Sequence, residues 1–581
     1  MRKKGVAKLF LNSIKPFGFW IIFAIILAIG SAVLGLFTPK ILGEMTDIAK
    51  DSFATGLDWD ALGMKITIII ILFTSSSILN YFQAYILGVV TAKYTKSLRK
   101  QILEKITRLP ISYFDNHQFG DTLSCMTNDI DIIATSMSQE IADVSLSLTT
   151  LIGVMVIMLT ISIPLSIVTF IVVPLSVFVV ARIAKFAQKY FKKQQATLAV
   201  LNSKIEESYS NQVIIKSNSY EKTALADFDK TNKELATTSR KAQFFASLAF
   251  PVTHIFTNLG YVAVCILGGY LVIERRISLG NLQAFIGYVS RFNRPITEVA
   301  STTSTIQSLL AASERIFNFL NADEEEPDPE NNRTIEKVKG AVVFDHVKFS
   351  YDKKHTVIKD FSANILPGQK VAIVGPTGAG KTTIINLLMR FYEPDSGSIT
   401  IDDVPINEMT RADVRTMFGM VLQDTWLFSG SIEDNLRYGN QQASLNEIEE
   451  AARISNIHHT IKALPKGYES VISENSDNIS AGEKQLLTIA RAIVANPSMI
   501  ILDEATSNVD TRTEQLIQAA FDKITKGRTS FIIAHRLSTI RNADLILVMK
   551  DGDIVEQGTH DTLLKKKGFY AELYNSQFTE E

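Results

Sequence analysis

Long runs without charged residues alternate with polar stretches in the first half of the chain. Residues 17–37, 66–92, 144–181 and 242–273 contain no Asp, Glu, Lys or Arg. A transmembrane helix needs roughly 20 apolar residues to cross about 30 Å of hydrocarbon, and 144–181 is long enough for two crossings around Pro164. The pattern predicts five membrane spans, at about 17–37, 66–92, 144–163, 165–183 and 244–273.

A sixth span is predicted at about 277–303, where an apolar stretch is followed by charge. Arg291, Arg294 and Glu298 follow the apolar residues 277–290. Each would cost roughly 2.5 to 3.5 kcal/mol at a lipid-facing midplane, so we expect them near an interface or facing a wet interior. A re-entrant or peripheral helix is the alternative. An even number of spans is favoured because both flanking regions have cytoplasmic features.

The distribution of Lys and Arg predicts the orientation of these spans. Basic residues are frequent in the first 15 residues and again between Lys93 and Arg108, whereas the loop between the first two spans is acidic. Positive charge favours the cytoplasmic side, so both basic segments are predicted to lie there. Residues 1–16 are expected to form an interfacial amphipathic helix. The chain is therefore predicted to be a multi-pass protein of a cell membrane.

The remaining segments complete a prediction of two domains. Polar stretches at 93–140 and 184–241 have helical periodicity, which extends the spans into the cytoplasm, with turns near 113–121 and 208–217. The transmembrane domain would cover 17–320, and the acidic, Pro-containing residues 321–340 are typical of an exposed linker. From 341 to 581, short β-branched runs alternate with helical stretches, as in a buried α/β sheet.

Net charge and cysteine content argue against a nucleic-acid partner and against a structural disulfide. The formal net charge is −1 with 20% charged residues, so no basic excess indicates nucleic acid as a partner. The two cysteines, Cys125 and Cys265, fall in a predicted cytoplasmic segment and inside a predicted span. We expect no structural disulfide from either.

A glycine-rich loop follows the apolar strand KVAIVG. Glycines let backbone N–H groups wrap a phosphate chain, and the next helix adds its positive N-terminal end. Lys381 is predicted to reach the β and γ phosphates of ATP, and the Thr382 hydroxyl to ligate Mg²⁺. A Gly-rich turn before an ordinary helix is the alternative. The predicted ATP-binding loop comprises Gly375, Pro376, Thr377, Gly378, Ala379, Gly380, Lys381, Thr382 and Thr383.

Two acidic residues end the apolar strand MIILDE. Asp503 suits the shell of Mg²⁺, and Glu504 suits a general base that polarises the attacking water. An acidic pair at a strand end is otherwise a solvated edge, and the glycine-rich loop favours the catalytic interpretation. Gln423 and His535 also follow apolar strands, where a lone histidine is more often structural.

The order and spacing of these motifs resemble the nucleotide-binding domain of ATP-binding cassette (ABC) proteins. The motifs are Tyr351, the glycine-rich loop, Gln423, ISAGEKQ, ILDEATS, SNVD and His535. The membrane half is similar to the type IV, or exporter, branch, which fuses six long spans to one cassette. The expected fold is thus an all-α six-helix transmembrane domain joined to an α/β P-loop nucleotide-binding domain.

This resemblance also implies roles for individual residues. Tyr351 would stack on adenine, and Gln423 would contact Mg²⁺ and the attacking water. His535 would contact the γ phosphate and orient Glu504, with Lys381 completing the catalytic set. The family further implies a dimer that sandwiches ATP between two cassettes, with Asp510 at their seam.

The signature that would contact ATP held by the partner cassette is altered. The family usually has LSGGQ, whereas this chain has Ile479, Ser480, Ala481, Gly482 and Glu483. Ser480 and Glu483 also fit a capping box that stabilises a helix start. Alternatively, Glu483 places negative charge beside the γ phosphate, and two like charges 4 Å apart cost about 4 kcal/mol at an effective dielectric of 20.

An intact hydrolytic set beside an altered signature favours a heterodimer. The chain resembles the subunit of heterodimeric bacterial multidrug exporters that carries the catalytic glutamate, with one competent and one degenerate ATP site. The predicted function is ATP-driven export of hydrophobic or amphipathic compounds, with ATP and Mg²⁺ as cofactors. The expected partners are a second ABC subunit, membrane lipid and a small-molecule substrate, not nucleic acid. A lipid or peptide exporter, or a homodimer that tolerates the variant signature, remains an alternative.

Overall fold

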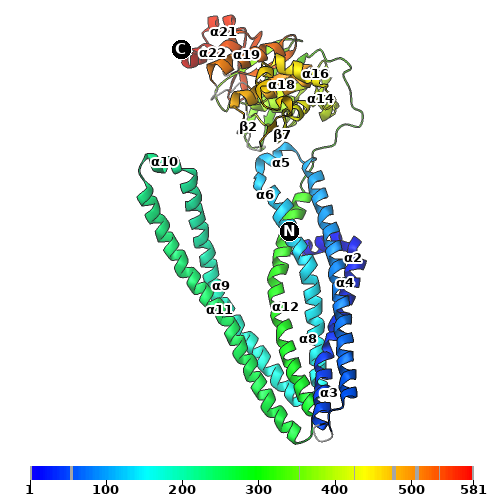
Figure 1. Cartoon of the computed structure of the whole chain (residues 1–581). Coiled ribbons are helices and arrows are strands. Elements are labelled where there is room, and N and C mark those ends of the chain that lie inside the picture. Colours follow the sequence, from blue (N-terminus) through cyan, green and yellow to red (C-terminus); the bar gives the residue numbers. More distant parts are fainter. Residues whose placement is uncertain are drawn as a thin grey trace. The chain divides into compact units, whose positions relative to one another are not determined.

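The computed structural model describes residues 3–52, 56–352, 354–423, 425–473, 479–503, 510–534 and 537–578, with the backbone alone at several positions, mostly between 293 and 304. The chain divides into two compact units (Figure 1). The membrane unit contains residues 1–107 and 119–322, and the nucleotide unit contains residues 108–118 and 323–581. A short segment from the membrane half of the sequence therefore belongs structurally to the nucleotide unit.

The membrane unit is built from long helices, because apolar runs continue into polar stretches of helical periodicity without a helix-breaking turn. Two π-helical segments, η2 (Cys125–Asp129) and η3 (Ser136–Glu140), interrupt the third long helical stretch. The α-helices are α1 (Lys3–Ile14), α2 (Gly18–Leu36), α3 (Thr38–Asp51), α4 (Trp59–Ile106), α6 (Phe119–Ser124), α7 (Ile130–Thr135), α8 (Ile141–Ile161), α9 (Ile163–Ser210), α10 (Gln212–Ser217), α11 (Glu221–Ile273) and α12 (Leu279–Leu320).

Five helical stretches among the described residues are long and apolar enough to cross a membrane. They are Gly5–Asp51, Trp59–Ile106, Phe119–Ile161, Ile163–Ser210 and Glu221–Ile273. The predicted sixth span lies on α12, which is a continuous helix from Leu279 to Leu320. That α12 crosses the membrane stays a prediction, because its charged residues lower its hydropathy.

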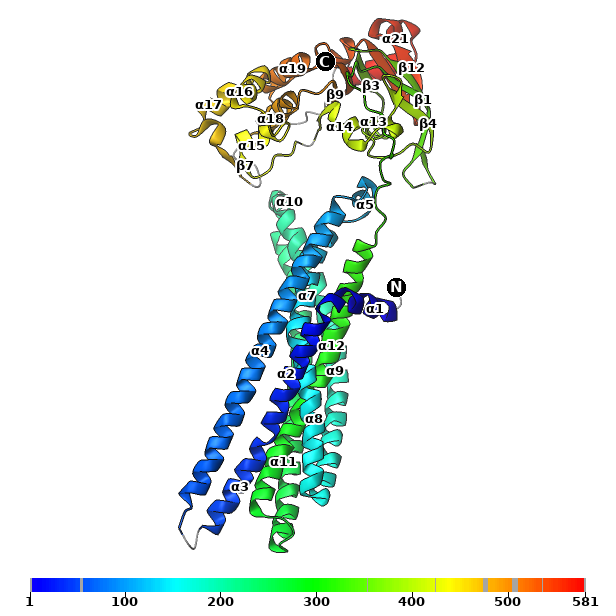
Figure 2. The same ribbon diagram turned by 90° about the vertical axis from the view of Figure 1, so that its right-hand side faces the viewer.

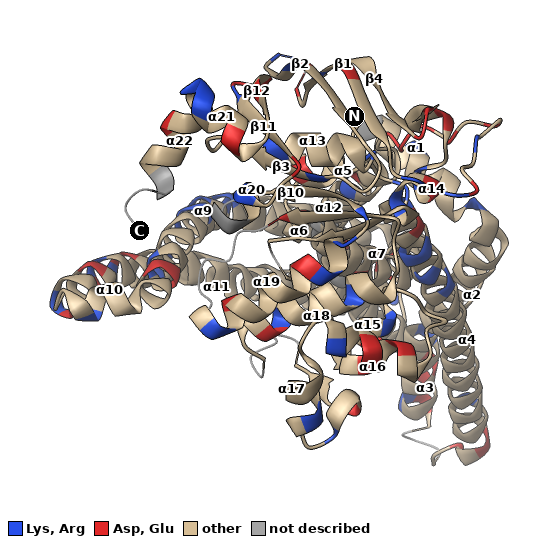
Figure 3. Cartoon of the chain, turned by 90° about the horizontal axis from the view of Figure 1, so that it is seen from above, with Lys and Arg blue, Asp and Glu red and all other residues tan. Residues whose placement is uncertain are grey.

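Helices α9 and α11 form a long antiparallel hairpin joined by α10 (Figures 1 and 2). Ion pairs tie the two helices together, with Lys204 Nζ 2.5 Å from an Asp227 carboxylate oxygen and Lys193 Nζ 3.1 Å from Glu234. Charged residues gather at the α10 end of the hairpin (Figure 3). The chain reverses in the region predicted as a turn near 208–217, and the six-residue helix α10 forms part of that reversal.

The core of the membrane unit brings α2, α8, α9, α11 and α12 together. Phe285 and Tyr288 on α12 are fully buried there, and the Tyr288 hydroxyl donates a 2.7 Å hydrogen bond to the carbonyl of Leu36. Helices α3 and α12 cross closely at Gly43 and Gly280. A Cβ atom at Gly43 would lie 2.2 Å from the Gly280 carbonyl oxygen, so only glycine permits this approach.

The nucleotide unit contains a mainly parallel six-stranded sheet and an antiparallel four-stranded sheet. The six-stranded order is β12-β11-β3-β10-β9-β6, the four-stranded order is β2-β1-β4-β5, and β7 pairs with β8. The strands are β1 (Val342–Ser350), β2 (Thr356–Ile365), β3 (Lys370–Val374), β4 (Ser396–Ile401), β5 (Val404–Pro405), β6 (Phe418–Val421), β7 (Gly430–Ser431), β8 (Val471–Ile472), β9 (Met499–Asp503), β10 (Thr529–Ile533), β11 (Leu545–Lys550) and β12 (Asp553–Gly558).

Two hydrophobic cores fill this unit, one on each face of the parallel sheet. Helices α15 to α19 gather on one side of the unit, and the antiparallel sheet lies on the other (Figure 2). The helices are α5 (Ile111–Asn116), α13 (Lys381–Leu388), α14 (Arg411–Thr416), α15 (Ile432–Arg437), α16 (Leu445–Ile454), α17 (His458–Ala463), α18 (Ala481–Val494), α19 (Thr511–Thr525), α20 (Leu537–Arg541), α21 (His560–Lys566) and α22 (Phe569–Phe578).

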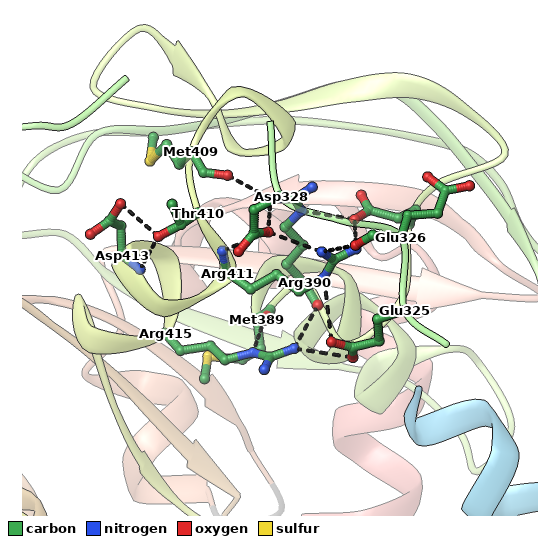
Figure 4. A network of polar contacts seen from close by, with 11 residues as sticks. Glu325, Glu326, Asp328, Met389, Arg390, Met409, Thr410, Arg411, Asp413 and Arg415 are labelled. Atoms are coloured by element: carbon green, nitrogen blue, oxygen red, sulfur yellow. Dashed lines mark hydrogen bonds and ion pairs between the residues drawn. The ribbon is translucent and has the colours of Figure 1, made fainter. Parts of the chain in front are cut away.

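The acidic linker is mostly exposed but is held to the nucleotide unit by ion pairs (Figure 4). Arg411, with only 9% of its surface exposed, donates hydrogen bonds to Asp328 at 2.9 Å and to Glu393 at 3.2 Å. Arg390 donates to the same Glu393 oxygen at 2.8 Å. Because Arg390 lies two residues beyond the end of α13, this network connects the linker to the end of the helix that begins at Lys381.

Candidate functional site

The predicted motifs meet at one edge of the six-stranded sheet. Strands β3, β10, β9 and β6 are parallel neighbours, so their carboxyl ends lie side by side. Ile533 at the end of β10 is in register with both Asp503 on β9 and Ile373 on β3. The glycine-rich loop follows β3, and Gln423 lies just beyond β6. This is the edge where α/β folds bind their ligands.

The glycine-rich loop adopts backbone angles that favour glycine. Gly378 has φ of +83° and Gly380 has φ of +96°, both in the left-handed region. A Cβ atom at Gly380 would lie 2.7 Å from the Ile358 side chain. The loop is therefore closely packed against β2, and α13 begins with its N–H groups directed at the loop.

Lys381 is held across this loop by backbone carbonyl groups. Its Nζ donates to the carbonyl of Gly375 at 2.7 Å and of Pro376 at 3.1 Å, and only 9% of the residue is exposed. Burial lowers the pKa of Lys381, while the charge of Asp503 opposes that shift. A buried ammonium group facing a backbone loop is suited to binding a polyanion.

A cavity of about 410 Å³ lies between the loop and the strand ends. Thr382, Gln423 and Asp503 line it together with loop residues from Thr377 to Thr383. A hydroxyl, an amide oxygen and a carboxylate are ligands that Mg²⁺ accepts when phosphates and water complete its shell. The residues therefore fit a magnesium nucleotide, and no group of three His, Cys, Asp or Glu side chains gathers among the described residues to hold a different metal.

Tyr351 lies beside the loop without being part of the cavity wall. It is 46% exposed, and its hydroxyl donates to Thr383 Oγ1 at 3.2 Å. Its ring meets those of Phe349 and Tyr392 edge to face. Stacking of Tyr351 on adenine stays a prediction. Gly375 and Pro376 also do not line the cavity. Their carbonyl groups accept the hydrogen bonds of Lys381.

Glu504 and His535 lie outside the described residues. In the sequence, Glu504 directly follows the last residue of β9 and His535 comes two residues after β10. Their catalytic assignment stays a prediction.

The altered signature begins a well-capped helix. The Ser480 backbone N–H and hydroxyl both donate to Glu483 Oε2 at 2.8 Å, and the Glu483 N–H donates back to the Ser480 hydroxyl at 3.3 Å. This geometry confirms the capping box. Ala481 is exposed, whereas Gly482 is buried. The structure contains one chain, so contact of these residues with ATP on another cassette stays a prediction.

Arg491, on the same helix, fixes it to the segment that follows Gln423. Its guanidinium donates to the Asn435 carbonyl at 2.9 Å and to the Asn435 side chain at 3.1 Å. The buried Asn435 amide in turn donates to the Phe428 carbonyl at 2.9 Å. Sequence reasoning missed this pair, although an Asn in an otherwise apolar-faced helix is a usable signal.

Asp510 caps the next helix, α19. Its carboxylate accepts backbone hydrogen bonds from Arg512 at 3.1 Å and Thr513 at 3.0 Å. Hydrogen bonding to Thr513 lowers the pKa of Asp510. Capping of α19 explains the contacts of Asp510 within one chain. Its position at the interface between two cassettes stays a prediction.

Sequence reasoning also missed how the short helix α5 joins the nucleotide unit. The Tyr392 hydroxyl donates to the carboxylate of Asp115 on α5. Burial raises the pKa of Tyr392, and the bond to Asp115 adds to the shift. The Glu325 N–H also donates to the Arg108 carbonyl at 3.0 Å. Residues 113–121, expected as a turn, instead contain the end of α5 and the start of α6, and α5 contacts the nucleotide unit through Asp115.

Two charged residues of the predicted sixth span contact other helices, whereas the Arg294 side chain lies outside the described part of the chain. Arg291 donates to the Gly35 carbonyl at 2.6 Å, and Glu298 accepts from the Ser147 hydroxyl at 2.6 Å. Both were expected to face a wet interior or an interface, and they line a cavity within the membrane unit.

Large aromatic residues of α11 and α12 divide into buried and exposed groups. Phe285 and Tyr288 are core residues, whereas Phe244, Phe250 and Tyr261 are at least 47% exposed.

Family models match both parts of the chain. Residues 21–296 match the ABC transporter transmembrane region, and residues 358–507 match the ABC transporter domain. The chain is 40% identical over 586 aligned positions to the "Fatty acid ABC transporter ATP-binding/permease protein" of Mycobacterium bovis, covering 94% of this chain and 93% of that protein.

Two further relatives cover nearly the same length. The "Putative multidrug export ATP-binding/permease protein YgaD" of Bacillus subtilis is 32% identical over 99% of both chains. The "ATP-dependent lipid A-core flippase" of Syntrophus aciditrophicus is 32% identical over 92% of this chain and 88% of that protein.

Proposed function

The chain belongs to the ABC transporter family, in which ATP hydrolysis is coupled to transport, and on that premise we propose that it exports hydrophobic or amphipathic compounds across the bacterial cytoplasmic membrane. It would do so as one half of a heterodimer with one competent and one degenerate ATP site. One observation carries this proposal. The chain has a cavity lined by the phosphate loop, Gln423 and Asp503, but the Ser480 hydroxyl of its signature is bonded to Glu483.

At the competent site the residues of this chain have distinct tasks. Lys381 would bind the β and γ phosphates, and Thr382, Gln423 and Asp503 would hold Mg²⁺, which would supply positive charge to neutralise the phosphates. Glu504 accepts a proton from the attacking water, and His535 orients Glu504 and the γ phosphate. The shared edge of β3, β9 and β10 supports this assignment, since the phosphate loop and Asp503 line one cavity there and Glu504 follows Asp503 in the sequence.

The signature supports a partner that differs from this chain. Two copies of this chain would place Glu483 next to the γ phosphate at both sites, although each copy retains its hydrolytic residues. A partner with an intact signature would complete this chain's site. Its own phosphate loop would receive Ser480 and Glu483 and would hold nucleotide with little cleavage. A homodimer that tolerates the variant signature is the alternative.

The tip of the α9–α11 hairpin supports a second subunit as well. Tyr209 is 82% exposed, Val213 81% and Ile214 60%, so three large side chains lack cover in one chain. Apolar side chains at a polar, cytoplasmic tip are usually covered by a partner. We assign this tip to the nucleotide-binding domain of the second subunit.

Transport would follow from closure of the two cassettes on ATP. The closed state binds ATP more tightly than the open state, so ATP shifts the equilibrium toward closure. Helix α5, bonded to Tyr392, would carry that movement to the spans and change an inward-facing cavity to an outward-facing one. Hydrolysis by Glu504 then resets the transporter.

A lipid-type cargo is a second candidate. Relatives named for fatty acid transport and for lipid A-core flipping favour it, and their shared fold accommodates either class. A peptide exporter also has the same motifs.

The proposal is tested by ATP-driven uptake into inside-out proteoliposomes that contain the assembled transporter. Glu504→Gln should reduce ATP turnover and uptake by at least a hundredfold while ATP binding persists. Glu469→Gln, an exposed carboxylate on a surface turn, is the matched control and should leave both rates unchanged. Normal turnover by Glu504→Gln would refute the catalytic assignment.

A further inference from the structure

A groove of about 370 Å³ lies in the membrane unit, where the start of α2 meets the second half of α4. Helices α2 and α4 pack side by side (Figure 2), and the short helix η1 (Lys15–Phe17) turns the chain from α1 into α2. The volume is within the range of roughly 300 to 1,000 Å³ that ligand cavities occupy. Apolar and aromatic side chains form most of the wall, and among the described residues that line it only Lys93 is charged.

The buried residue Tyr94 fixes the wall of this groove at η1. Its hydroxyl shares a 2.6 Å hydrogen bond with the Ser13 hydroxyl. Its ring meets those of Phe10 and Phe17 edge to face, with centroid distances of 6.3 and 6.2 Å. Phe17 also lines the groove, so the turn between α1 and α2 is held against α4. The groove is therefore preformed, and a preformed site loses less conformational entropy when it binds a ligand.

The groove is open to the surroundings of the membrane unit. Trp20 is 50% exposed and Tyr85 is 62% exposed, although both line it. The described hydrophobic core around Phe285 contains none of the residues that line the groove. Helices α2 and α4 belong to stretches that are long and apolar enough to cross a membrane, so lipid is the medium expected at an open face between them.

The cationic end of the groove has no acidic partner. Within the described part of the chain, the exposed side chain of Lys93 makes no hydrogen bond or ion pair. The same holds for Lys96, which lies one turn further along the same face of α4. Residues 1–43 and 61–103 contain no Asp or Glu, so both segments that form the groove carry only positive charge. An anionic group beside Lys93 would meet no competing carboxylate from either segment.

The groove is charged at one end and apolar along the rest. Tyr85 lies eight residues before Lys93 on α4, which corresponds to roughly 12 Å along a helix. Ile86 and Val89 supply apolar wall between them. Lys93 is the first charged residue on α4 after Lys65, so it marks the end of the apolar part of this helix. This polarity matches an amphiphile with an anionic headgroup and a hydrocarbon chain.

We propose that the groove binds an anionic phospholipid of the surrounding membrane, with its phosphate at Lys93 and an acyl chain along Trp20 and Tyr85. Basic residues beside membrane-crossing helices attract anionic lipids, whereas the cation of a zwitterionic headgroup would oppose the lysine. Trp and Tyr rings suit this position, because they combine an apolar ring with a polar group. The site is separate from the ATP cavity and does not depend on the proposed export function.

Brominated lipids test this occupant, because bromine on an acyl chain quenches the fluorescence of a nearby tryptophan. The chain has three tryptophans, and the exposed Trp59 and Trp426 are replaced by Phe so that Trp20 alone reports. The full chain is placed in phosphatidylcholine nanodiscs with increasing fractions of dibrominated phosphatidylglycerol or dibrominated phosphatidylcholine. Half-maximal quenching should require a roughly tenfold lower fraction of phosphatidylglycerol than of phosphatidylcholine.

Variants test whether the lysine causes this preference. Lys93→Gln should abolish the difference between the two lipids, whereas Lys93→Arg keeps the charge and should retain it. Lys185→Gln is the matched control, because Lys185 is an exposed lysine just beyond the uncharged run 144–181 and does not line the groove. The control should retain the full preference for phosphatidylglycerol.

Three results would overturn the inference. The first is equal quenching by the two lipids, or the same loss of preference in Lys185→Gln as in Lys93→Gln. The second is no quenching by either lipid, which would show that protein, such as a second subunit, covers the groove. The third is half-maximal quenching by dibromostearate at a lower fraction than phosphatidylglycerol, which would assign the groove to a fatty acid. Because the readout is binding, none of these results bears on ATP-driven export.

Discussion

The carboxylate of Glu483 accepts hydrogen bonds from both the backbone N–H and the hydroxyl of Ser480, each at 2.8 Å. The hydroxyl that the family uses to contact a γ phosphate is thus bonded within its own helix terminus. The same arrangement places a full negative charge at a helix start that would otherwise attract an anion. The altered letters of the signature therefore form a capping box at the start of α18, and we expect the added charge to weaken its binding of ATP.

Replacing Glu483 with Gln should strengthen nucleotide binding by the assembled transporter. Glutamine keeps the capping pattern but removes a charge whose repulsion of phosphate is about 4 kcal/mol at 4 Å and an effective dielectric of 20. We expect the half-maximal ATP concentration for closure to fall at least tenfold, measured by nucleotide retained after rapid filtration. The control is Glu447→Gln, because Ser444 and Glu447 form an equivalent capping box on α16. Equal effects of the two variants would contradict the charge explanation.

Gly380→Ala should disrupt the phosphate loop, whereas Gly368→Ala should strain only the backbone. Gly380 has φ of +96°, and an added Cβ would lie 2.7 Å from Ile358. Gly368 has φ of +73° but has no atom within 4 Å of an added Cβ. Each alanine should cost about 1 to 2 kcal/mol of unfolding free energy through backbone strain, and Gly380→Ala alone should also reduce ATP binding. If both variants bound ATP normally by equilibrium dialysis, the packing account of the loop would be wrong.

Tyr392→Phe should uncouple ATP turnover from transport. The substitution removes the hydroxyl that bonds to Asp115 on α5 and leaves the phosphate loop unaltered. The ratio of substrate transported to ATP hydrolysed should fall severalfold, and Asp115→Asn should have a smaller effect because the amide oxygen still accepts. An unchanged ratio in both variants would show that α5 does not transmit closure through this contact.

Arg411→Ala should destabilise the nucleotide unit through its linker. Arg411 is 9% exposed and is bonded to Asp328 and Glu393, so its loss leaves each of these partly buried carboxylates with Arg390 as a remaining partner and removes a bonded guanidinium from both. Since these carboxylates keep about a third of their exposure, we expect a loss of about 1 to 3 kcal/mol in unfolding free energy. Arg333→Ala, which removes an exposed pair with Glu408, should cost less than about 1 kcal/mol. Chemical denaturation of the full chain measures the unfolding free energy of both variants. Similar losses in Arg411→Ala and Arg333→Ala would contradict a stabilising role for the buried Arg411.

The sequence predicted the parts of the site whose chemistry is local. The loop from Gly375 to Thr383 carries its glycines, lysine and hydroxyls within nine positions, and the parallel strands bring Asp503 and Gln423 to it. Contacts between distant positions left no such pattern. Asp115 and Tyr392 are 277 residues apart, and nothing near either residue identifies its partner.

The sequence predicted only some of the charged residues that line the cavity between α8 and α12. Arg291 and Glu298 interrupt an apolar run, which made them visible as residues that need a wet or interfacial environment. Asp143 directly precedes the uncharged run 144–181, and Glu140 lies in a π-helical segment. Hydropathy assigns both to a polar loop, and only the packing of α8 against α12 brings them together with Glu298.

The central claim is that this chain supplies the hydrolytic residues and needs a different subunit to supply an intact signature. The most direct measurement compares ATP-driven transport by proteoliposomes containing this chain alone with that by the chain purified from a host carrying the neighbouring genes. We predict that a second, related subunit copurifies and that transport by the pair exceeds transport by the single chain at least tenfold. Equal and full transport by this chain alone would contradict the claim.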